Sequence, residues 1–268
     1  ADMASDGDLW TRIIGSLYFI PLFLGIIAGF PYAFLAGGAA IIWLAYESAR
    51  MLTGELYTPR MSLIWILLVL PFFLAFAPLT TEVRALLWSG LVVICFFLNK
   101  QREPGFIGLI MLAAICLGML LTKQDGHLIL ICLAAVVSAG DIGAYVFGRL
   151  LGGPKLAPGI SPSKTWTGAA GGLFCSLLAV LILSFVLGAS LSEPAGWGFA
   201  ILVCIFAQSG DLFESRVKRR LGIKDSGSFV PGHGGALDRF DGYLSVLPLI
   251  IAIDHIQYTP FWLRLSTL

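Results

Sequence analysis

Long apolar stretches follow one another along most of this chain, with short polar segments between them. A helix needs about 20 mostly apolar residues to cross a bilayer. Stretches of that length lie at residues 11–30, 31–49, 62–80, 82–99, 105–122, 127–148, 166–189, 197–215 and 236–255. Pro31 leaves almost no loop between the first two, which predicts a tight hairpin or a re-entrant pair. The pattern predicts an all-α fold, a polytopic transmembrane bundle of about nine helices.

The composition supports a membrane protein rather than a soluble one. Hydrophobic residues make up 58% of the chain and charged residues 12%, with a mean hydropathy of +0.90. An average soluble domain has about 25% charged residues. The cysteines lie inside apolar stretches without a C-x-x-C pair, which is typical of small buried side chains: Cys95, Cys116, Cys132, Cys175 and Cys204.

Basic residues fall unevenly on the two sides of the predicted bundle. With nine spans, thirteen of the seventeen Lys and Arg residues lie on the side of the amino terminus, and three lie on the opposite side. Cytoplasmic loops carry the excess of Lys and Arg in membrane proteins. This bias predicts that the amino terminus and both long polar loops, at about 150–164 and 220–232, are cytoplasmic.

Glycines are spaced four residues apart at three places in the apolar stretches. These pairs are Gly25 and Gly29, Gly148 and Gly152, and Gly168 and Gly172. Such spacing lets helices approach closely, either within one chain or between two copies. We favour packing within the monomer, and a homodimer stays open.

One polar region lies between residues 138 and 168. Lys164 lies there among hydroxyl side chains, including that of Ser161, in a segment rich in Gly and Pro. Backbone amides, hydroxyls and an ammonium group together suit a phosphate. A solvated loop that follows the charge bias is the alternative. The glycines and spacing of a Walker A loop are absent.

The second polar region, residues 208–243, places acids near the ends of two predicted helices. Asp211 shares one helix face with Ser215 and Lys218, and Asp238 shares another with Asp241. Carboxylates on rigid helices suit Mg²⁺, which takes one or two carboxylates plus water and substrate phosphate. We expect Asp211 and Asp238 to meet across the two helices and share one ion. The alternative is that the acids only pair with neighbouring arginines.

The run from Ser215 to Asp241 reads SRVKRRLGIKDSGSFVPGHGGALDRFD. It resembles the signature of the phosphatidate cytidylyltransferases, also called CDP-diacylglycerol synthases. The positions that fit this pattern are Ser215, Lys218, Arg219, Lys224, Asp225, Gly227, Val230, Pro231, His233, Gly234, Gly235, Asp238, Arg239 and Asp241. Ala236 occupies an apolar slot and is a mild departure. The resemblance extends upstream through DIGAY-FGR and SPSKTW-G, so it covers roughly the carboxy-terminal half.

The resemblance implies an enzyme of phospholipid biosynthesis, a metal-dependent nucleotidyltransferase. Its substrates would be CTP and phosphatidic acid, and its products CDP-diacylglycerol and pyrophosphate. It would be a multi-pass protein of a bacterial-type inner membrane with a cytoplasmic active site. Residues 1–125 would form N-terminal membrane helices, and residues 126–268 would form the catalytic part. No nucleic acid is expected as a partner.

The resemblance also assigns roles to residues of this sequence. It implies Mg²⁺, as one ion or two, at Asp211, Asp238 and Asp241. It makes Lys218 and Arg219 substrate-binding clamps, together with Ser161 and Lys164. The candidate catalytic residues are Lys224, Asp225, His233 and Arg239. For His233, loop ordering, substrate contact and acid–base chemistry all stay open.

Three other functions were weighed against this one. H-G-G occurs in the oxyanion turn of lipases, but the chain has no G-x-S-x-G, which excludes a serine hydrolase of that type. The D-x-x-D-G at Asp238 begins the motif of the CDP-alcohol phosphatidyltransferases, but the further acids that motif needs do not follow. A cation channel or transporter would not account for the basic residues around the acids.

Overall fold

A computed structural model describes residues 17, 19–54, 58–98, 103–123, 125–187, 194–227 and 234–255. Within these ranges the chain is almost entirely helical. The helices are α2 (Ile20–Ile27), α3 (Tyr32–Thr53), α4 (Pro59–Leu74), α5 (Thr81–Leu98), α6 (Pro104–Leu121), α7 (Gly126–Leu151), α8 (Trp166–Leu187), α9 (Pro194–Arg220) and α10 (Leu237–His255). Each predicted apolar stretch overlaps one of them, so the helical fold predicted from the sequence is confirmed.

Five of the described helices are long and apolar enough to cross a membrane, namely α3, α6, α7, α8 and α9. The apolar helix α4 is shorter, and α2 has only eight described residues. The structure therefore supports a multi-pass membrane protein, whereas the count of nine membrane helices stays a prediction.

The structure differs from the sequence analysis in the polar segment after α7. Two strands, β1 (Lys155–Ala157) and β2 (Ser161–Thr165), form an antiparallel hairpin there, with Lys155 opposite Thr165. Gly152 adopts a positive φ of 62° just after α7, a conformation that glycine adopts readily at a helix end. Thr165 ends the hairpin and begins α8, because its Oγ1 accepts the Gly168 amide at 3.1 Å.

The chain divides into two compact units, each with parts from distant regions of the sequence. Unit 1 comprises residues 1–127 and 217–240, and unit 2 comprises residues 128–216 and 241–268. The sequence predicts one boundary after residue 125, but residues 217–240 belong to unit 1. The functional division into an N-terminal part and a catalytic part stays a prediction.

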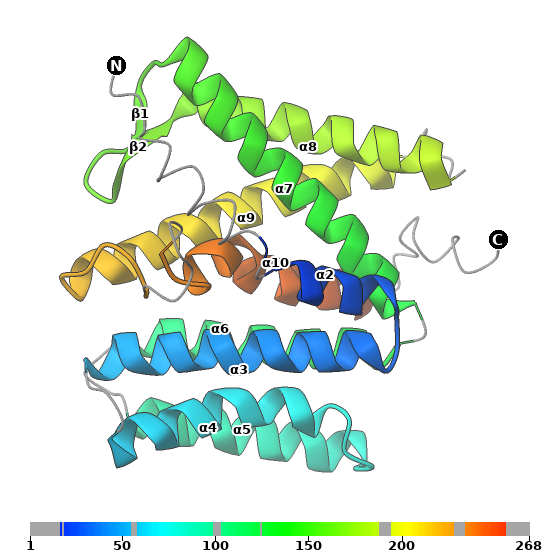
Figure 1. Ribbon diagram of the computed structural model, residues 1–268, viewed down its shortest axis with the longest axis vertical. Coiled ribbons are helices and arrows are strands. Elements are labelled where there is room, and N and C mark those ends of the chain that lie inside the picture. The colour runs from blue at the N-terminus through cyan, green and yellow to red at the C-terminus, as the bar shows by residue number, and fades with distance from the viewer. Residues whose placement is uncertain are drawn as a thin grey trace. The chain divides into compact units, whose positions relative to one another are not determined.

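Unit 1 is built around α3, α4 and α6. The helix α3 contacts α2, α4 and α6, while α4 also contacts α5 and α6. Figure 1 shows α3 beside α6, with α4 and α5 next to them. The core holds fully buried apolar side chains from these helices, among them Leu52, Ile64, Leu68, Phe72, Ile107, Ile110 and Met111.

Unit 2 is held partly by close approach of α7 and α8 at glycines. A Cβ atom at Gly143 would lie 2.6 Å from the carbonyl oxygen of Gly171, closer than two such atoms can come. A Cβ at Gly148 would lie 3.4 Å from the Cα of Gly168. In unit 1, a Cβ at Gly25 would lie 2.8 Å from the Cβ of Ala36. Gly25, Gly148 and Gly168 thus serve contacts within one chain, as favoured from the sequence.

Four of the five cysteines, all but Cys175, are buried, and all five thiols are free. The prediction that the cysteines are small buried side chains is confirmed for those four.

Candidate active site

In unit 1 the signature segment continues past the end of α9. The amide of Ile223 donates to the carbonyl of Lys218 at 3.0 Å, and the amide of Gly222 donates to the carbonyl of Arg219 at 3.2 Å. Gly222 has a φ of 74°. This pair of bonds around a left-handed glycine is the Schellman motif, which stops a helix and turns the chain sharply. The sequence R-R-L-G-I therefore ends α9 and directs the following residues into the site.

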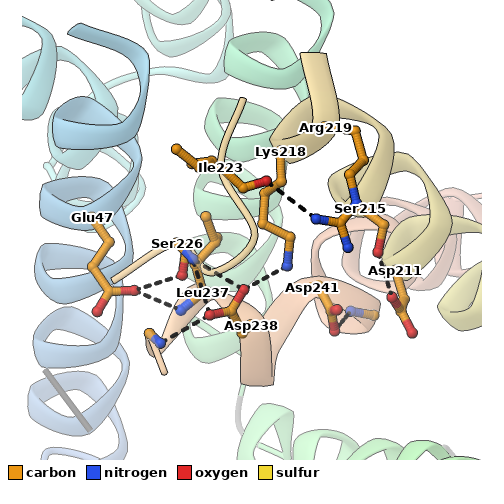
Figure 2. Close-up of polar contacts among 12 residues, drawn as sticks. Glu47, Asp211, Ser215, Lys218, Arg219, Ile223, Ser226, Leu237, Asp238 and Asp241 are labelled. Atoms are coloured by element: carbon orange, nitrogen blue, oxygen red, sulfur yellow. Dashed lines mark hydrogen bonds and ion pairs between the residues drawn. The ribbon is translucent and has the colours of Figure 1, made fainter. Parts of the chain in front are cut away.

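Asp238, in the first turn of α10, lies at the centre of the polar contacts in unit 1 (Figure 2). Its Oδ1 accepts Nζ of Lys218 at 2.6 Å. Its Oδ2 accepts the amides of Ser226 at 3.1 Å and Gly235 at 2.9 Å. Both charged side chains are largely buried, so each compensates the charge of the other.

The glycine pair of the signature leaves room for this carboxyl group. A Cβ at Gly234 would lie 3.0 Å from Oδ2 of Asp238 and 3.7 Å from the Cβ of Asp225, and Gly234 has a φ of 81°. Any other residue there would be strained and would crowd the acid. The two ends of the motif, around Asp225 and Asp238, are therefore brought together in unit 1.

The other candidate residues of unit 1 lie at its exposed edge. Lys224 and Asp225 are exposed on the turn after α9, and Arg239 is exposed in the first turn of α10. Arg219 is also exposed, and its Nη1 donates to the carbonyl of Ile223 at 3.4 Å. His233 lies outside the described residues. Exposed cations beside a buried acid–base pair give unit 1 groups that can contact phosphate.

In unit 2, Asp211 lies on α9 between a cation and a hydroxyl. Nζ of Lys164, from β2, forms an ion pair with Oδ2 of Asp211. Ser215 Oγ donates to Oδ1 of the same acid at 3.3 Å (Figure 2). The hairpin thus brings Lys164, which lies 47 positions earlier in the sequence, to the acid on α9.

The helices α9 and α10 approach closely within unit 2. A Cβ at Gly210 would lie 2.9 Å from the carbonyl oxygen of Asp241, and Ser245 Oγ donates to the carbonyl of Phe206 at 2.6 Å. The nearby carboxylates of Asp211 and Glu214 repel the Asp241 carboxyl group. Unit 2 therefore gathers acids from two helices near one another.

The predicted phosphate pocket of Ser161 and Lys164 is not tested by the structure. Both residues lie on β2, whose pairing with β1 is irregular between Ser161 and Thr165, and Nζ of Lys164 pairs with Asp211. Ser161 Oγ instead lies 3.5 Å from Ser163 Oγ. The phosphate-binding role of both residues stays a prediction.

Whether Mg²⁺ fits this site depends on how the side chains that could be its ligands are arranged. Among the described residues, no group of three or more His, Cys, Asp or Glu side chains is arranged to hold a metal ion. Asp211 and Asp241 fit a more open site, since Mg²⁺ takes one or two carboxylates and fills its remaining positions with water and phosphate. Asp238 belongs to unit 1 and already accepts an ammonium group and two amides. The predicted ion shared by Asp211 and Asp238 stays a prediction.

Glu47 on α3, which the sequence motifs do not include, contacts the signature segment within unit 1. Glu47 is 2% exposed, and its Oε2 accepts the amide of Leu237 at 2.9 Å (Figure 2). One signal could have drawn attention to it. Glu47 is the only charged residue between Tyr32 and Ala49, and an acid inside an apolar helix points to a functional role.

Comparison with known proteins extends the resemblance beyond the signature. The model of the cytidylyltransferase family matches residues 10–256. The chain belongs to this family. The family match includes the first five apolar stretches, which the motifs alone could not assign.

Named relatives support the same family. The phosphatidate cytidylyltransferase of Staphylococcus haemolyticus (strain JCSC1435) is 33% identical over 258 residues, which cover 90% of this chain and 95% of that protein. The phosphatidate cytidylyltransferase of Staphylococcus aureus (strain COL) is 35% identical over 176 residues, 63% of this chain and 68% of that protein. The phosphatidate cytidylyltransferase of Brucella suis biovar 1 (strain 1330) is 46% identical over 138 residues, half of each chain. The resemblance stated from the sequence is confirmed.

Proposed function

We propose that this chain transfers the CMP unit of CTP to phosphatidic acid, giving CDP-diacylglycerol and pyrophosphate. The observation that carries this proposal is the 33% identity to a phosphatidate cytidylyltransferase over 90% of this chain and 95% of that protein. A match over nearly the full length of both proteins covers the membrane helices as well as the signature. The charged groups of both units fit the chemistry of such a transfer.

The reaction needs cations and alignment more than a nucleophilic side chain. A phosphate oxygen of phosphatidic acid attacks the α-phosphorus of CTP and forms the new P–O bond. The bond from the α-phosphorus to the oxygen that bridges to the β-phosphorus breaks, and pyrophosphate leaves with that electron pair. The attacking phosphate is already an anion, so the protein contributes positive charge and orientation.

The exposed cations of unit 1 are proposed to contact the phosphates of the substrates. Lys224, Arg219 and Arg239 lie at its exposed edge and have the charge for this role. Lys218 differs because it is buried and engaged by Asp238. We assign Lys218 to holding the signature segment in place, with the exposed cations as the phosphate clamps.

The acids of unit 2 are proposed to hold Mg²⁺. Asp211 and Asp241 would be its carboxyl ligands, and the ion would neutralise charge on the phosphate oxygens. Lys164, which pairs with Asp211, would turn to a substrate phosphate when the acid binds the cation. The role of Asp225 beside the glycine pair is proposed as orientation of the turn that carries Lys224.

We also propose a setting for the reaction. The relatives are bacterial proteins, and the excess of Lys and Arg lies in the loops that carry the candidate residues. This supports an enzyme of a bacterial inner membrane that meets CTP from the cytoplasm and phosphatidic acid at the headgroup layer.

Pyrophosphate release by the purified protein in detergent micelles tests the proposal. With Mg²⁺ present, release should require both CTP and phosphatidic acid, and EDTA should abolish it. Release from CTP without phosphatidic acid would indicate a nucleotide hydrolase instead. Consumption of CDP-diacylglycerol with an added alcohol would indicate a phosphatidyltransferase. Either result would contradict the proposal.

A further inference from the structure

A buried acid on a membrane helix of unit 1 contacts the signature segment. Glu47 lies on α3, one of the five helices long and apolar enough to cross a membrane. Its side chain is buried, and ionisable groups in such helices are costly and need partners. The proposed reaction gives Glu47 no role as a ligand or a cation. Its partners show what it does.

Both carboxyl oxygens of Glu47 accept hydrogen bonds. Oε1 accepts Nε1 of Trp43, one turn earlier on α3, at 3.1 Å. Oε2 accepts the backbone amide of Leu237 at 2.9 Å and Oγ of Ser226 at 3.3 Å. Figure 2 shows the last two contacts beside those of Asp238. Two of the three donors therefore come from the signature segment.

The contact with Leu237 matters for the start of α10. Leu237 is the first residue of that helix, and the first amides of a helix have no partner within it. Glu47 supplies the missing acceptor from another helix, at the end where negative charge is favourable. The next residue is Asp238, so the Glu47 contact fixes the backbone immediately before the acid that engages Lys218.

Ser226 forms hydrogen bonds with both Glu47 and Asp238. Its hydroxyl donates to Glu47, while its backbone amide donates to Oδ2 of Asp238 at 3.1 Å. Ser226 is buried and directly follows the exposed turn that carries Lys224 and Asp225. A shift of Glu47 would therefore move the turn and the start of α10 together.

Two glycines of the signature segment fit around the carboxyl group. A Cβ at Gly235 would lie 2.6 Å from Oε2 of Glu47, and a Cβ at Gly227 would lie 3.0 Å from Oε1. Any side chain at Gly235 would have to displace the acid or the segment. The space at these positions is thus occupied by a side chain from a distant helix.

We propose that Glu47 is a positioning residue for the signature segment. It holds the backbone on both sides of residues 228–233 so that Lys224, Asp225 and Asp238 keep the arrangement that transfer requires. The catalytic meaning of this role rests on the proposed function. The tie between α3 and the segment does not, so the two can be tested separately.

The test compares Glu47→Gln with the wild type by amide hydrogen exchange and by steady-state kinetics. Glutamine keeps the size but replaces one acceptor with a donor. Peptides that contain Ser226 and Leu237 should exchange at least about tenfold faster, because a hydrogen bond to a charged group typically contributes that much. Peptides from α4 and α6, which pack on the same helix, should be unchanged. Ser48→Ala is the matched control, since Ser48 is buried beside Glu47 and its hydroxyl donates to the carbonyl of Leu44 within α3.

A second substitution separates positioning from simple burial. In Glu47→Gln the side-chain oxygen can accept hydrogen bonds from Leu237 and Ser226 only if the side-chain NH₂ group faces Nε1–H of Trp43. Two hydrogen-bond donors then face each other, which is unfavourable. Trp43→Phe removes that donor and keeps an aromatic ring stacked on Phe19. The double variant should therefore recover most of the lost protection and most of the lost kcat, whereas a general packing defect would not be repaired.

Three results would overturn the proposal. The first is unchanged exchange in the signature segment of Glu47→Gln, and the second is faster exchange that spreads equally to α4 and α6. The third is a double variant no better than Glu47→Gln. If Glu47→Gln does not fold, Gly235→Ala perturbs the same contact from the other side, and unchanged exchange there would also overturn it. A wild-type protein inactive on CTP and phosphatidic acid would refute the proposed function, while the exchange results would still decide the role of Glu47.

Discussion

Lys218 and Asp238 are opposite charges buried in unit 1, and each would be costly to leave without the other. Their pairing shows that burial decides what a lysine does, which its residue type in the sequence does not reveal. Lys218 lies in the same run of basic residues as Lys224, yet only Lys224 is exposed and able to reach a ligand in solution. The two lysines are therefore expected to differ sharply when they are replaced.

Lys224→Gln removes one exposed positive charge and leaves the buried contacts of unit 1 in place. We expect the KM for CTP or for phosphatidic acid to rise by about tenfold to a hundredfold, which corresponds to roughly 1.4–2.8 kcal/mol of lost binding. Steady-state kinetics with each substrate varied in turn measures this.

The matched control is Lys123→Gln, which also replaces an exposed lysine but on the side of the membrane predicted to face away from CTP. Its kinetics should equal those of the wild type. Unchanged kinetics for a folded Lys224→Gln variant would show that this lysine contributes only to membrane topology.

At the scale of elements, the contact between α7 and α8 shows why glycine is needed inside an apolar helix. Glycine lowers helix stability by about 1 kcal/mol relative to alanine. That cost is offset where backbones touch, as at Gly143, where a Cβ would lie 2.6 Å from both the Gly171 oxygen and the Cys175 sulfur. Glycines with open space around them gain nothing of this kind.

Gly143→Ala should therefore destabilise unit 2, by about 1–3 kcal/mol for overpacking. Gly108→Ala on α6 is the control, because no atom of the described residues lies within 4 Å of the added Cβ. That variant should be neutral or slightly stabilised, owing to the better helix propensity of alanine. Thermal unfolding in detergent compares the two, and equal melting temperatures would contradict the close contact between α7 and α8.

The sequence predicts the elements well because a membrane helix is specified by its own residues. Apolar runs and their polar ends locate α6 and α8 within a few residues, and R-R-L-G-I marks the end of α9. The hairpin of β1 and β2 was missed because its segment is short, rich in Gly and Pro, and lacks an alternating apolar pattern. Contacts between distant elements leave no such local pattern.

The candidate site was predicted only in part for the same reason. The motif points to Asp238 and Lys218 but does not predict that they contact each other. That contact depends on the turn at Gly222 and on the left-handed conformation of Gly234. Glu47 lies 190 positions before Leu237, so no spacing rule links them. The irregular pairing of β1 and β2 between Ser161 and Thr165 likewise depends on contacts that the sequence does not reveal.

At the scale of the whole molecule, the membrane orientation joins the charge bias to the proposed chemistry. CTP is a soluble anion, so the exposed cations of the polar loops must lie on the side where it is present. The bias of Lys and Arg predicts that those loops are cytoplasmic. The proposed function therefore requires that the whole chain adopt this orientation in the membrane.

Single cysteines in a cysteine-free variant test this orientation in intact cells. Gly159→Cys in the hairpin and Arg220→Cys at the end of α9 are exposed and should be protected from a membrane-impermeant thiol reagent. Lys123→Cys, exposed on the opposite predicted side, should react. Reaction at position 159 or 220 before the cells are opened would overturn the predicted orientation.

The most direct test of CMP transfer follows the phosphorus atoms of CTP. The purified protein is incubated with phosphatidic acid, Mg²⁺ and CTP labelled at either the α- or the γ-phosphate, and the lipid is then extracted. The proposed transfer predicts that the α-label enters the lipid phase as CDP-diacylglycerol, while the γ-label stays in water as pyrophosphate. A γ-label in the lipid, or an α-label that stays wholly in water while CTP is consumed, would contradict the account.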